Sequence, residues 1–580
     1  MLSSSNIRKI ALILICIFLI GCVDNGKSTY IESSDQEQKL DVVDDTIVWD
    51  IENSVLNNMT LQDNKGIYGS DIDNEVITLY LTVYPTPDEE GNLLTMADFD
   101  KQQARQMDYN PELEVLMQEG DGNGPLKESF GFGALEPNGI IRVRGHSARG
   151  GRYKSFKVKL YDRAGSWRNQ KVLNLNKHPF DTTKVTNKFA FDYFEMLPDI
   201  VSFRTQFVHL YIKDISKDSN EYVDYGLYTH IEQPNKTFLR SHGLDDAGNM
   251  YKARSFEFLR YPDKLKAEDD PEYDEVAFDT VLNIRESKSH KKLLNMLDDV
   301  NNMNLDFNQV FNTHFNKENY LTWIAINVIF GNEDTVSQNF IIYSPQNAMT
   351  WYFLPWDYDG GMKYGGRRGV SSVVDSMYGI GRYWGVILHR RFFRNPENVE
   401  ALTLKIDELM EIITPENTKD LTDSYKPVIK KYIYKTPDIG LLRTRPDFVE
   451  PYLDSYQEII EYNRERYINA LENPMPVFVA EPIQNQDGTF LFSWEPSHDI
   501  QGDLITYNLD IARDYNFTNI VFSKDNMKET SVNTSKINTG IYYWRLTIKD
   551  SKGNTQASFN NYLPDGAEET LWGVSQLIVR

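Results

Sequence analysis

An aspartate, an asparagine and a second aspartate follow one another in the middle of the chain, in an order that suits phosphoryl transfer. Asn339 lies five residues after Asp334, and Asp357 lies 23 residues after Asp334. Transfer of a phosphoryl group to a hydroxyl needs a carboxylate beside the nucleophile and hard oxygen ligands that hold Mg²⁺ against the phosphates. These three side chains offer both kinds of group, and Asp359 adds another oxygen ligand.

The segments around these residues predict how they are brought together. Residues 317–330 are apolar on most of the helix circumference and predict a buried helix that ends just before Asp334. Residues 339–343 and 350–354 are apolar runs joined by a turn-forming segment, which predicts a hairpin. Protein kinases place an Asp, an Asn and, after a hairpin, a second Asp in this order. We therefore expect one rim to carry Asp334, Asn339 and Asp357.

Two earlier segments predict a basic sheet face. Residues 140–144 and 155–160 alternate apolar with basic residues, which is typical of half-buried strands. A turn of small residues flanked by cations, residues 145–152, joins them. On the pattern alone, a solvated face is the more common outcome for such cations, and contact with phosphates is the functional alternative.

The remaining pattern predicts a mixed α+β fold with a β-rich first lobe and a helical second lobe. Residues 75–84, 207–213 and 225–232 predict strands, and residues 180–197 predict a helix with Asp181 as N-cap and Pro198 as its stop. Further helices are expected at 398–413 and 452–471. The two lobes together predict a domain that spans residues 46–473.

The last hundred or so residues have a different texture. Short alternating runs at 490–494, 507–512 and 542–548 are separated by turn residues and predict a small all-β sandwich over residues 474–580. The stretch from Phe492 to Ile511 and the later residues 540–553 resemble a fibronectin type III module. Such modules usually act as spacers or binding surfaces, so no chemistry is expected here.

The first residues predict a targeting signal. Arg8 and Lys9 precede the apolar run 10–20, as in a secretory signal peptide, and Leu19-Ile20-Gly21-Cys22 resembles the bacterial lipobox. The resemblance implies a signal peptide at residues 1–21, lipid on Cys22 and a polar linker at 22–45. We therefore expect a membrane-anchored, extracytoplasmic lipoprotein at the cell surface or in the periplasm. An uncleaved signal anchor is the alternative.

Composition excludes some partners and sites. The net charge is −24, with 61 Lys and Arg against 85 Asp and Glu and no basic run, so a nucleic-acid partner is not expected. Cleavage before Cys22 would remove the other cysteine, Cys16, and a disulfide or a cysteine metal site would then be impossible.

Four blocks, taken in order, resemble the CotH (spore-coat protein H) kinase-like family. They are RGHSAR with KSFKVKL at 144–160, GLYTHIE with Phe238-Leu239 at 226–239, NMYK at 249–252 and PWDYD at 355–359. The resemblance covers roughly residues 75–471. It implies an atypical two-lobed protein-kinase-like fold that binds ATP with Mg²⁺ or Mn²⁺ and phosphorylates serine or threonine in a protein substrate.

The resemblance also implies roles by position. Asp334 would be the catalytic aspartate, while Asn339, Asp357 and Asp359 would bind metal. The candidate nucleotide-binding residues are Lys157, with Lys159 as its alternative, Arg144 and Glu232. Arg144 would either hold a phosphate or pair with an acid such as Glu232. The acid that would pair with Lys157 is left open among Asp192, Glu195 and Glu232.

The departures from conventional kinases leave two functions in view. The chain has no Gly-x-Gly-x-x-Gly loop, so residues 145–151 would have to cover the phosphates, and it has no Ala-Pro-Glu segment. The first hypothesis is an extracytoplasmic, lipid-anchored kinase. The second is a catalytically silent kinase-fold lipoprotein that binds cell-envelope or extracellular glycan or protein, in part through its C-terminal module.

Two other enzyme classes fit the sequence less well. His146 and Ser147 could suggest a hydrolase, but their turn lacks the second glycine of a nucleophile elbow. Asp357 and Asp359 lie only two residues apart in a glycine-ended loop, which fixes no separation for a glycosidase acid pair.

Overall fold

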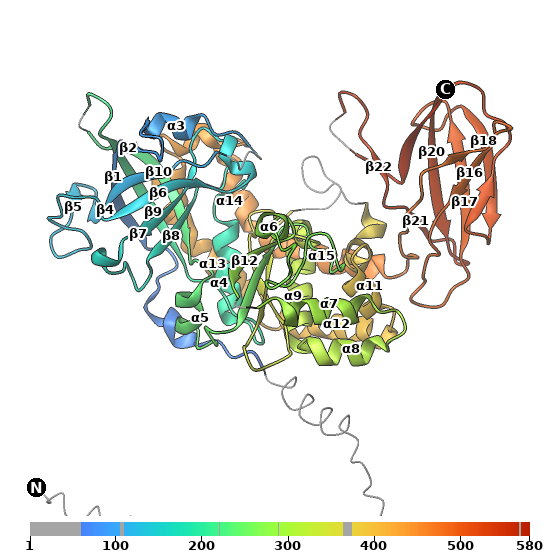
Figure 1. The fold of residues 1–580 in the computed structure, drawn as a ribbon, viewed down its shortest axis with the longest axis horizontal. Coiled ribbons are helices and arrows are strands. Elements are labelled where there is room, and N and C mark those ends of the chain that lie inside the picture. The colour runs from blue at the N-terminus through green and yellow to red at the C-terminus, as the bar shows by residue number, and fades with distance from the viewer. Residues whose placement is uncertain (1–59, 105–108, 220, 288, 364–373, 568–569) are drawn as a thin grey trace, which may run out of the picture. The chain divides into compact units, whose positions relative to one another are not determined.

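The computed structural model describes residues 60–104, 109–219, 221–287, 289–363, 374–567 and 570–580. The predicted signal peptide, Cys22 and the linker lie outside these described residues. The described chain is a mixed α+β structure (Figure 1), with a β-rich N-terminal part, a helical middle and C-terminal sheets without helices. Among the described helices, none has both the length and the apolar character needed to cross a membrane.

The N-terminal part is built on one eight-stranded sheet that closes on itself. The strand order is β1-β9-β10-β8-β7-β6-β4-β5, and β1 also pairs with β4, which closes the ring. Alternate side chains of its strands point inward and form a separate apolar core that includes Leu79, Val115, Val158 and Leu210, all fully buried. The strands are β1 (Val76–Tyr84), β4 (Leu113–Asp121), β5 (Gly124–Pro125), β6 (Gly139–Arg144), β7 (Ser155–Leu160), β8 (Val172–Asn176), β9 (Thr205–Asp214) and β10 (Val223–Ile231).

Strands β6 and β7 confirm the predicted pair of half-buried strands. They are antiparallel, with Arg142 opposite Lys157. Ile141 and Val158 are buried in the core of the ring, so the basic residues of the same strands face the other side. The turn between the strands contains a short 3-10 helix, Ser147–Gly150.

Helix α4 (Thr186–Met196) is shorter than predicted, because residues 180–185 do not join it. Lys184 has a φ of 67°, which a right-handed helix does not accept. Asp181 is therefore not the N-cap, although its carboxylate still accepts the backbone N–H of Thr186 at 2.9 Å. The prediction was right about the chemistry of Asp181 and wrong about where the helix begins.

The predicted helix and hairpin beside Asp334 are confirmed. Helix α9 (Lys317–Ile329) is buried from Asn319 to its end, and the ring of Trp323 stacks on Phe353 with centroids 4.5 Å apart. Strands β13 (Phe340–Ser344) and β14 (Tyr352–Pro355) form the antiparallel hairpin. They belong to a four-stranded sheet of order β12-β11-β13-β14, in which β11 is Asn249–Ala253 and β12 is Leu282–Glu286.

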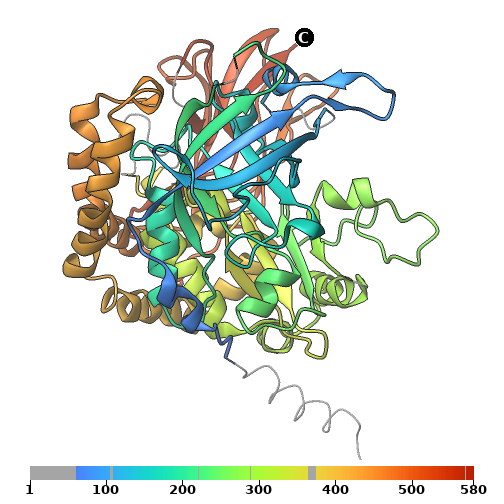
Figure 2. The ribbon, with the colours of Figure 1, turned by 90° about the vertical axis from the view of Figure 1, so that its left-hand side faces the viewer.

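The helices of the middle part surround a large aromatic core. Figure 2 shows α12 to α15 in orange as one group. Helix α12 confirms the helix predicted at 398–413, whereas the one predicted at 452–471 is divided at Ser455 into α14 and α15. The helices are α5 (Lys236–Ser241), α6 (Glu275–Asp279), α7 (Lys291–Asn301), α8 (Phe307–His314), α10 (Ile380–Tyr383), α11 (Ile387–Phe393), α12 (Pro396–Met410), α13 (Pro415–Val428), α14 (Pro446–Asp454) and α15 (Tyr456–Ala470). The short helix α3 (Met96–Asp100) belongs to the N-terminal part, where Met96 and Phe99 join the core of the closed sheet.

The C-terminal part consists of antiparallel sheets, two of which share one core. One sheet has the order β15-β16-β19, and the other has the order β18-β17-β20-β21 with β24 also paired to β20. Phe492 of the first sheet packs on Trp544 of the second, with ring centroids 5.0 Å apart. The strands are β15 (Ile483–Gln484), β16 (Phe490–Ser493), β17 (Thr506–Ala512), β18 (Ile520–Met527), β19 (Ser531–Asn533), β20 (Gly540–Lys549), β21 (Thr555–Ala557) and β24 (Val574–Val579).

Short two-residue strands complete the fold. They pair as β2 (Thr86–Pro87) with β3 (Leu93–Leu94), and as β22 (Asn561–Tyr562) with β23 (Leu571–Trp572).

Candidate functional site

Asp334 and Asn339 are in direct contact in the loop between α9 and β13. The Asn339 side-chain amide donates to Asp334 Oδ2 at 2.9 Å, and Gln338 donates to Oδ1 at 2.6 Å. Asn339 has a φ of 57°, a left-handed conformation that asparagine adopts more readily than most residues. Loss of surrounding water raises the pKa of the Asp334 carboxyl, Asp359 raises it further, and the Gln338 hydrogen bond opposes both.

The loop after β14 packs against the Asp334 loop. A Cβ placed on Gly360 would lie 3.4 Å from Asn332 Oδ1 and 3.8 Å from the Asp334 Cβ, which is ordinary van der Waals contact and shows how near the two loops lie. The Asn332 amide also reaches the backbone carbonyl of Asp357 at 3.5 Å. The hairpin therefore returns Asp357 to the same rim as Asp334.

Asp357 and Asp359 have opposite electrostatic surroundings. Burial and the nearby Asp359 raise the pKa of Asp357 to about 6, although Lys252 and Arg144 oppose the rise. Burial also disfavours ionisation of Asp359, but the nearby His178, Lys363 and Lys184 together outweigh it and lower the Asp359 pKa. His178 Nδ1 lies 3.6 Å from Asp359 Oδ2. Two carboxylates that repel each other in a partly buried loop form an arrangement that a divalent cation would stabilise.

A group of cations faces these acids. Burial, together with Arg285, Arg142 and Arg144, lowers the pKa of Lys157 to about 7. Burial and Arg285 lower the pKa of Lys252 to about 7, while Asp357 opposes the shift. These cations repel one another, and their partial burial reduces the screening by water. A bound polyanion would relieve this repulsion, so its binding is favoured here.

Arg144 connects the cationic group with the acidic one. Burial lowers the pKa of its guanidinium to about 10, and Asp357 and Asp359 oppose that shift. Burial also lowers the Arg285 pKa to about 10, and its buried Nε has no hydrogen-bond partner among the described residues. A buried N–H donor of a charged group costs free energy when it has no acceptor. A ligand oxygen that accepted from Arg285 would remove this cost.

The two lysines of β7 have different surroundings. Lys157 is half-buried and interacts with Arg144 and Arg285, whereas Lys159 is exposed one strand repeat further on. The charged groups that shift the Lys157 pKa most are all cations, so its partner acid stays unassigned. Asp192, one of the candidates, pairs with Lys188 at 2.9 Å.

Glu195, another candidate acid for Lys157, belongs to the same buried helix α4. Burial and the neighbouring Asp192 raise the pKa of its carboxyl to about 9. At neutral pH this group is therefore mostly protonated, and a protonated carboxyl is a poor partner for a lysine.

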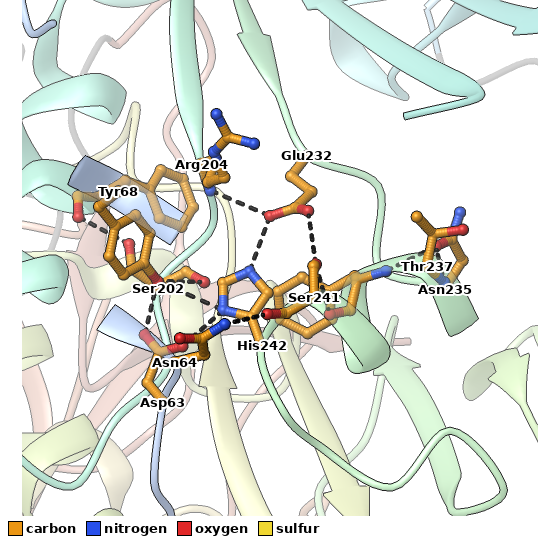
Figure 3. A network of polar contacts seen from close by, with 12 residues as sticks. Asp63, Asn64, Tyr68, Ser202, Arg204, Glu232, Asn235, Thr237, Ser241 and His242 are labelled. Atoms are coloured by element: carbon orange, nitrogen blue, oxygen red, sulfur yellow. Dashed lines mark hydrogen bonds and ion pairs between the residues drawn. The ribbon is translucent and has the colours of Figure 1, made fainter. Parts of the chain in front are cut away.

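Glu232 lies in a different network, which Figure 3 shows from close by. His242 Nε2 is 2.9 Å from Glu232 Oε2, and its Nδ1 is 2.7 Å from Asp63 Oδ1. Tyr68 donates a hydrogen bond of 2.6 Å to the same Asp63 carboxylate. The Glu232 carboxylate is thus bonded to a buried imidazole, and among the described residues neither a pairing with Arg144 nor one with Lys157 is found.

Sequence reasoning missed three residues of this site: Lys252, Arg285 and His178. Lys252 stands in the NMYK block that supported the family resemblance, and its Nζ lies 5.0 Å from the Trp356 ring centroid. The block could therefore have signalled it. Arg285 and His178 belong to no recognised block, and only the sheet order and the fold of the loops bring them here.

Comparison with protein families finds a match for the middle of the chain. The sequence model of a family described as CotH kinase protein matches residues 141–469. The match begins in β6 and ends in α15, so it includes the acid loops and the cationic group, while β1 and β4 of the closed sheet lie before it. No curated protein matches the chain.

Proposed function

This chain belongs to the CotH kinase family, whose model covers more than half of its length, and from that membership we propose a specific activity. The protein is an atypical ATP-dependent kinase that transfers the γ-phosphoryl group to a serine or threonine hydroxyl of a protein substrate, with Mg²⁺ or Mn²⁺ as metal. The observation that carries the proposal is the convergence of Asp334, Asn339 and Asp357 beside the cations Arg144 and Lys252, with Lys157 next to Arg144.

The acids and the amide would hold the metal. Asp357, Asp359 and Asn339 supply oxygen atoms, the ligands that Mg²⁺ and Mn²⁺ prefer. The donor set fits, because the pKa of Asp357 is raised to about 6 by burial and by Asp359, and a nearby divalent charge would favour its ionised form. When bound, the metal would offset the negative charge of the phosphates.

The cationic group would bind the nucleotide phosphates. Lys157 and Lys252 have pKa values lowered to about 7 by burial, so a polyphosphate would restore their charged forms. Arg144 interacts with the acids and with both lysines, and it would align a phosphate with the metal ligands. Arg285 offers a buried N–H that lacks a partner within the described chain.

Asp334 would receive the proton of the attacking hydroxyl. Hydrogen bonds from Gln338 and Asn339 fix the orientation of its carboxylate, while its raised pKa makes it a better proton acceptor. Each of those hydrogen bonds uses a different oxygen, and the remaining lone pairs stay open to a substrate.

The location belongs to the proposal as well. The lipobox-like Leu19-Ile20-Gly21-Cys22 supports lipidation at Cys22 and a membrane-anchored, extracytoplasmic address. The fibronectin type III-like sequence of residues 474–580 supports a binding role for the C-terminal part towards cell-envelope or extracellular glycan or protein.

One experiment tests the activity. Protein that starts at Asn25 is incubated with labelled ATP and Mg²⁺ or Mn²⁺, beside Asp334→Asn, Asp357→Asn and the exposed control Asp420→Asn of α13. We expect transfer by the wild-type and control proteins and loss of transfer in the two site variants. Absence of nucleotide binding with either metal would overturn the kinase proposal. Nucleotide binding without transfer would favour the catalytically silent binding protein.

A further inference from the structure

Three aspartates gather in the C-terminal part, outside the kinase site. Asp499, Asp503 and Asp550 each present a carboxylate oxygen, and these oxygens lie within 4.8 Å of one another. Asp499 is only 5% exposed and Asp550 only 3%. Carboxylates are almost never this deeply buried in one another's company unless a cation is near.

The sheet explains why these residues meet. Strands β17 and β20 are antiparallel neighbours, with Thr506 at the start of β17 opposite Lys549 at the end of β20. The loop with Asp499 and Asp503 leads into β17, and Asp550 directly follows β20. The three acids therefore lie at the same end of one sheet.

The backbone holds the carboxylates in place. Asp499 Oδ1 accepts the N–H groups of Gln501 and Asp503 at 3.0 and 2.9 Å. Asp550 Oδ1 accepts three successive N–H groups, those of residues 552–554, at 2.7 to 2.9 Å. Asp499 is thus fixed through Oδ1 alone, whereas Asp550 is held through both oxygens, because its Oδ2 accepts the Asn554 side-chain amide at 2.7 Å.

The second oxygen of Asp499 lacks a ligand. Asp499 Oδ2 is buried and has no hydrogen-bond partner among the described residues. A buried carboxylate oxygen without a partner costs free energy. A cation bound to this oxygen would offset that cost. The nearby cation is Lys552, whose ammonium pairs with Asp503 Oδ2 at 2.9 Å and whose side chain is 52% exposed. Within the part of the chain that the structure describes, this ammonium is the cation paired with the cluster, which leaves two of the three negative charges without an ion pair.

We propose that Asp499, Asp503 and Asp550 form a Ca²⁺ site. The donors are all hard oxygens, which excludes the nitrogen and sulfur ligands that zinc and copper favour. Ca²⁺ accepts several protein carboxylates at once, whereas Mg²⁺ usually keeps most of its waters and takes one or two. Lys552 is exposed enough to move into solvent when the ion enters.

Occupancy of this site would also stiffen the loops that meet helix α15. Gln501 Nε2 donates to the Leu471 carbonyl at 2.9 Å, and Asn554 Nδ2 donates to the Glu472 carbonyl at 2.9 Å. Both donors belong to the two loops that carry the aspartates. A cation that joins the loops would therefore also order the connection to the preceding helix.

The test is Ca²⁺ binding by calorimetry, without nucleotide, on protein that starts at Asn25. All proteins carry Asp357→Asn, so that the proposed kinase metal site does not contribute. We expect one bound Ca²⁺ with a Kd on the order of 10⁻⁴ M and a higher thermal midpoint in CaCl₂. Adding Asp499→Asn should weaken binding at least about tenfold. Adding Asp487→Asn, an exposed turn aspartate of the same part that caps Thr489, should change nothing.

Lys552→Gln keeps the test decisive if Asp499→Asn folds poorly. Removal of the competing ammonium should tighten Ca²⁺ binding by roughly threefold or more, a change that general destabilisation would not produce. The proposal is overturned if the Asp357→Asn protein binds no Ca²⁺. It is equally overturned if Asp499→Asn leaves the affinity unchanged or if Lys552→Gln weakens it.

Discussion

The kinase domain contains two groups of partly or fully buried charges, and their pKa values shift in opposite directions. At the candidate site, burial raises the pKa of Asp357 to about 6 and lowers that of Lys157 to about 7, so each group is pushed towards its neutral form. In the His242 network, hydrogen bonds to Asp63 and Glu232 outweigh burial and raise the His242 pKa. The Asp63 pKa is lowered in turn.

The difference separates the proposed ligand site from a structural contact. Asp63 and Glu232 bind both nitrogens of His242, so its charge is satisfied within the protein (Figure 3). Burial pushes Lys157 and Asp357 towards their neutral forms, and in the proposed function phosphate and metal would restore their charges.

The largest expected effect concerns the proposed base. Asp334→Asn keeps the size of the side chain but removes the proton acceptor, so phosphoryl transfer should fall by about 10²- to 10⁴-fold. Its unfolding free energy should change by less than about 1 kcal/mol, because the side chain reaches the surface. Kinase assays and denaturant titrations measure the two quantities. A large loss of stability would mean that Asp334 is a structural residue like those of the His242 network, which would contradict the prediction.

The His242 network should show the reverse pattern. His242→Gln leaves Asp63 and Glu232 without their counter-charge in a buried place, so the unfolding free energy should fall by about 3–5 kcal/mol. Transfer per folded molecule should persist. His209→Gln is the matched control, because its partner Asp224 is 40% exposed and its pair should contribute less than about 1 kcal/mol.

Stability of the network should depend on pH with a defined sign. The His242 pKa is raised above 6.5, so its contribution is present below pH 6.5 and lost as the pH rises through the folded-state pKa. The Asp63 pKa is lowered below 3.8, so its contribution is present above that pH and lost in stronger acid. Between pH 3 and 9, the thermal midpoint of the wild-type protein should therefore fall on the alkaline side as His242 loses its proton. His242→Gln should lack this fall, because it has no titrating group at this position.

Nucleotide affinity should fall as the pH rises through 7. Lys157 and Lys252 have pKa values of about 7 and lose their charge above it, while bound phosphate favours the ammonium, so binding takes up protons. From pH 6.5 to 8.5 the affinity should drop by about tenfold or more. Titration with a fluorescent ATP analogue measures it. In Lys157→Arg the decline should become shallower, because arginine keeps its charge.

The smallest expected effect distinguishes the two lysines of β7. Lys157→Met should lower nucleotide affinity by about tenfold, whereas the exposed Lys159→Met should lower it by less than about threefold. The same fluorescent titration compares them. A larger effect at Lys159 would mean that the exposed lysine, and not the partly buried Lys157, contacts the phosphate. Burial of a lysine would then not indicate nucleotide binding.

Part of the site could be predicted because its pattern is local. The spacing from Asp334 to Asn339 and the apolar runs of β13 and β14 are contiguous in the sequence, so their period and turn residues already predict the hairpin that returns Asp357. Helix α4 was placed too early because its start depends on Lys184, whose φ of 67° is set by the surrounding fold.

The sequence by itself determined the helical and strand periods, the basic face of β7 and the order of the acids around the hairpin. Only the tertiary structure decided that Lys252 and Arg285 join Lys157, because β11 pairs with both β12 and β13 across long stretches of chain. It also directed Glu232 to His242 rather than to a lysine. Periodicity is a property of neighbouring residues, whereas a charge responds to every group and every lost water around it in space.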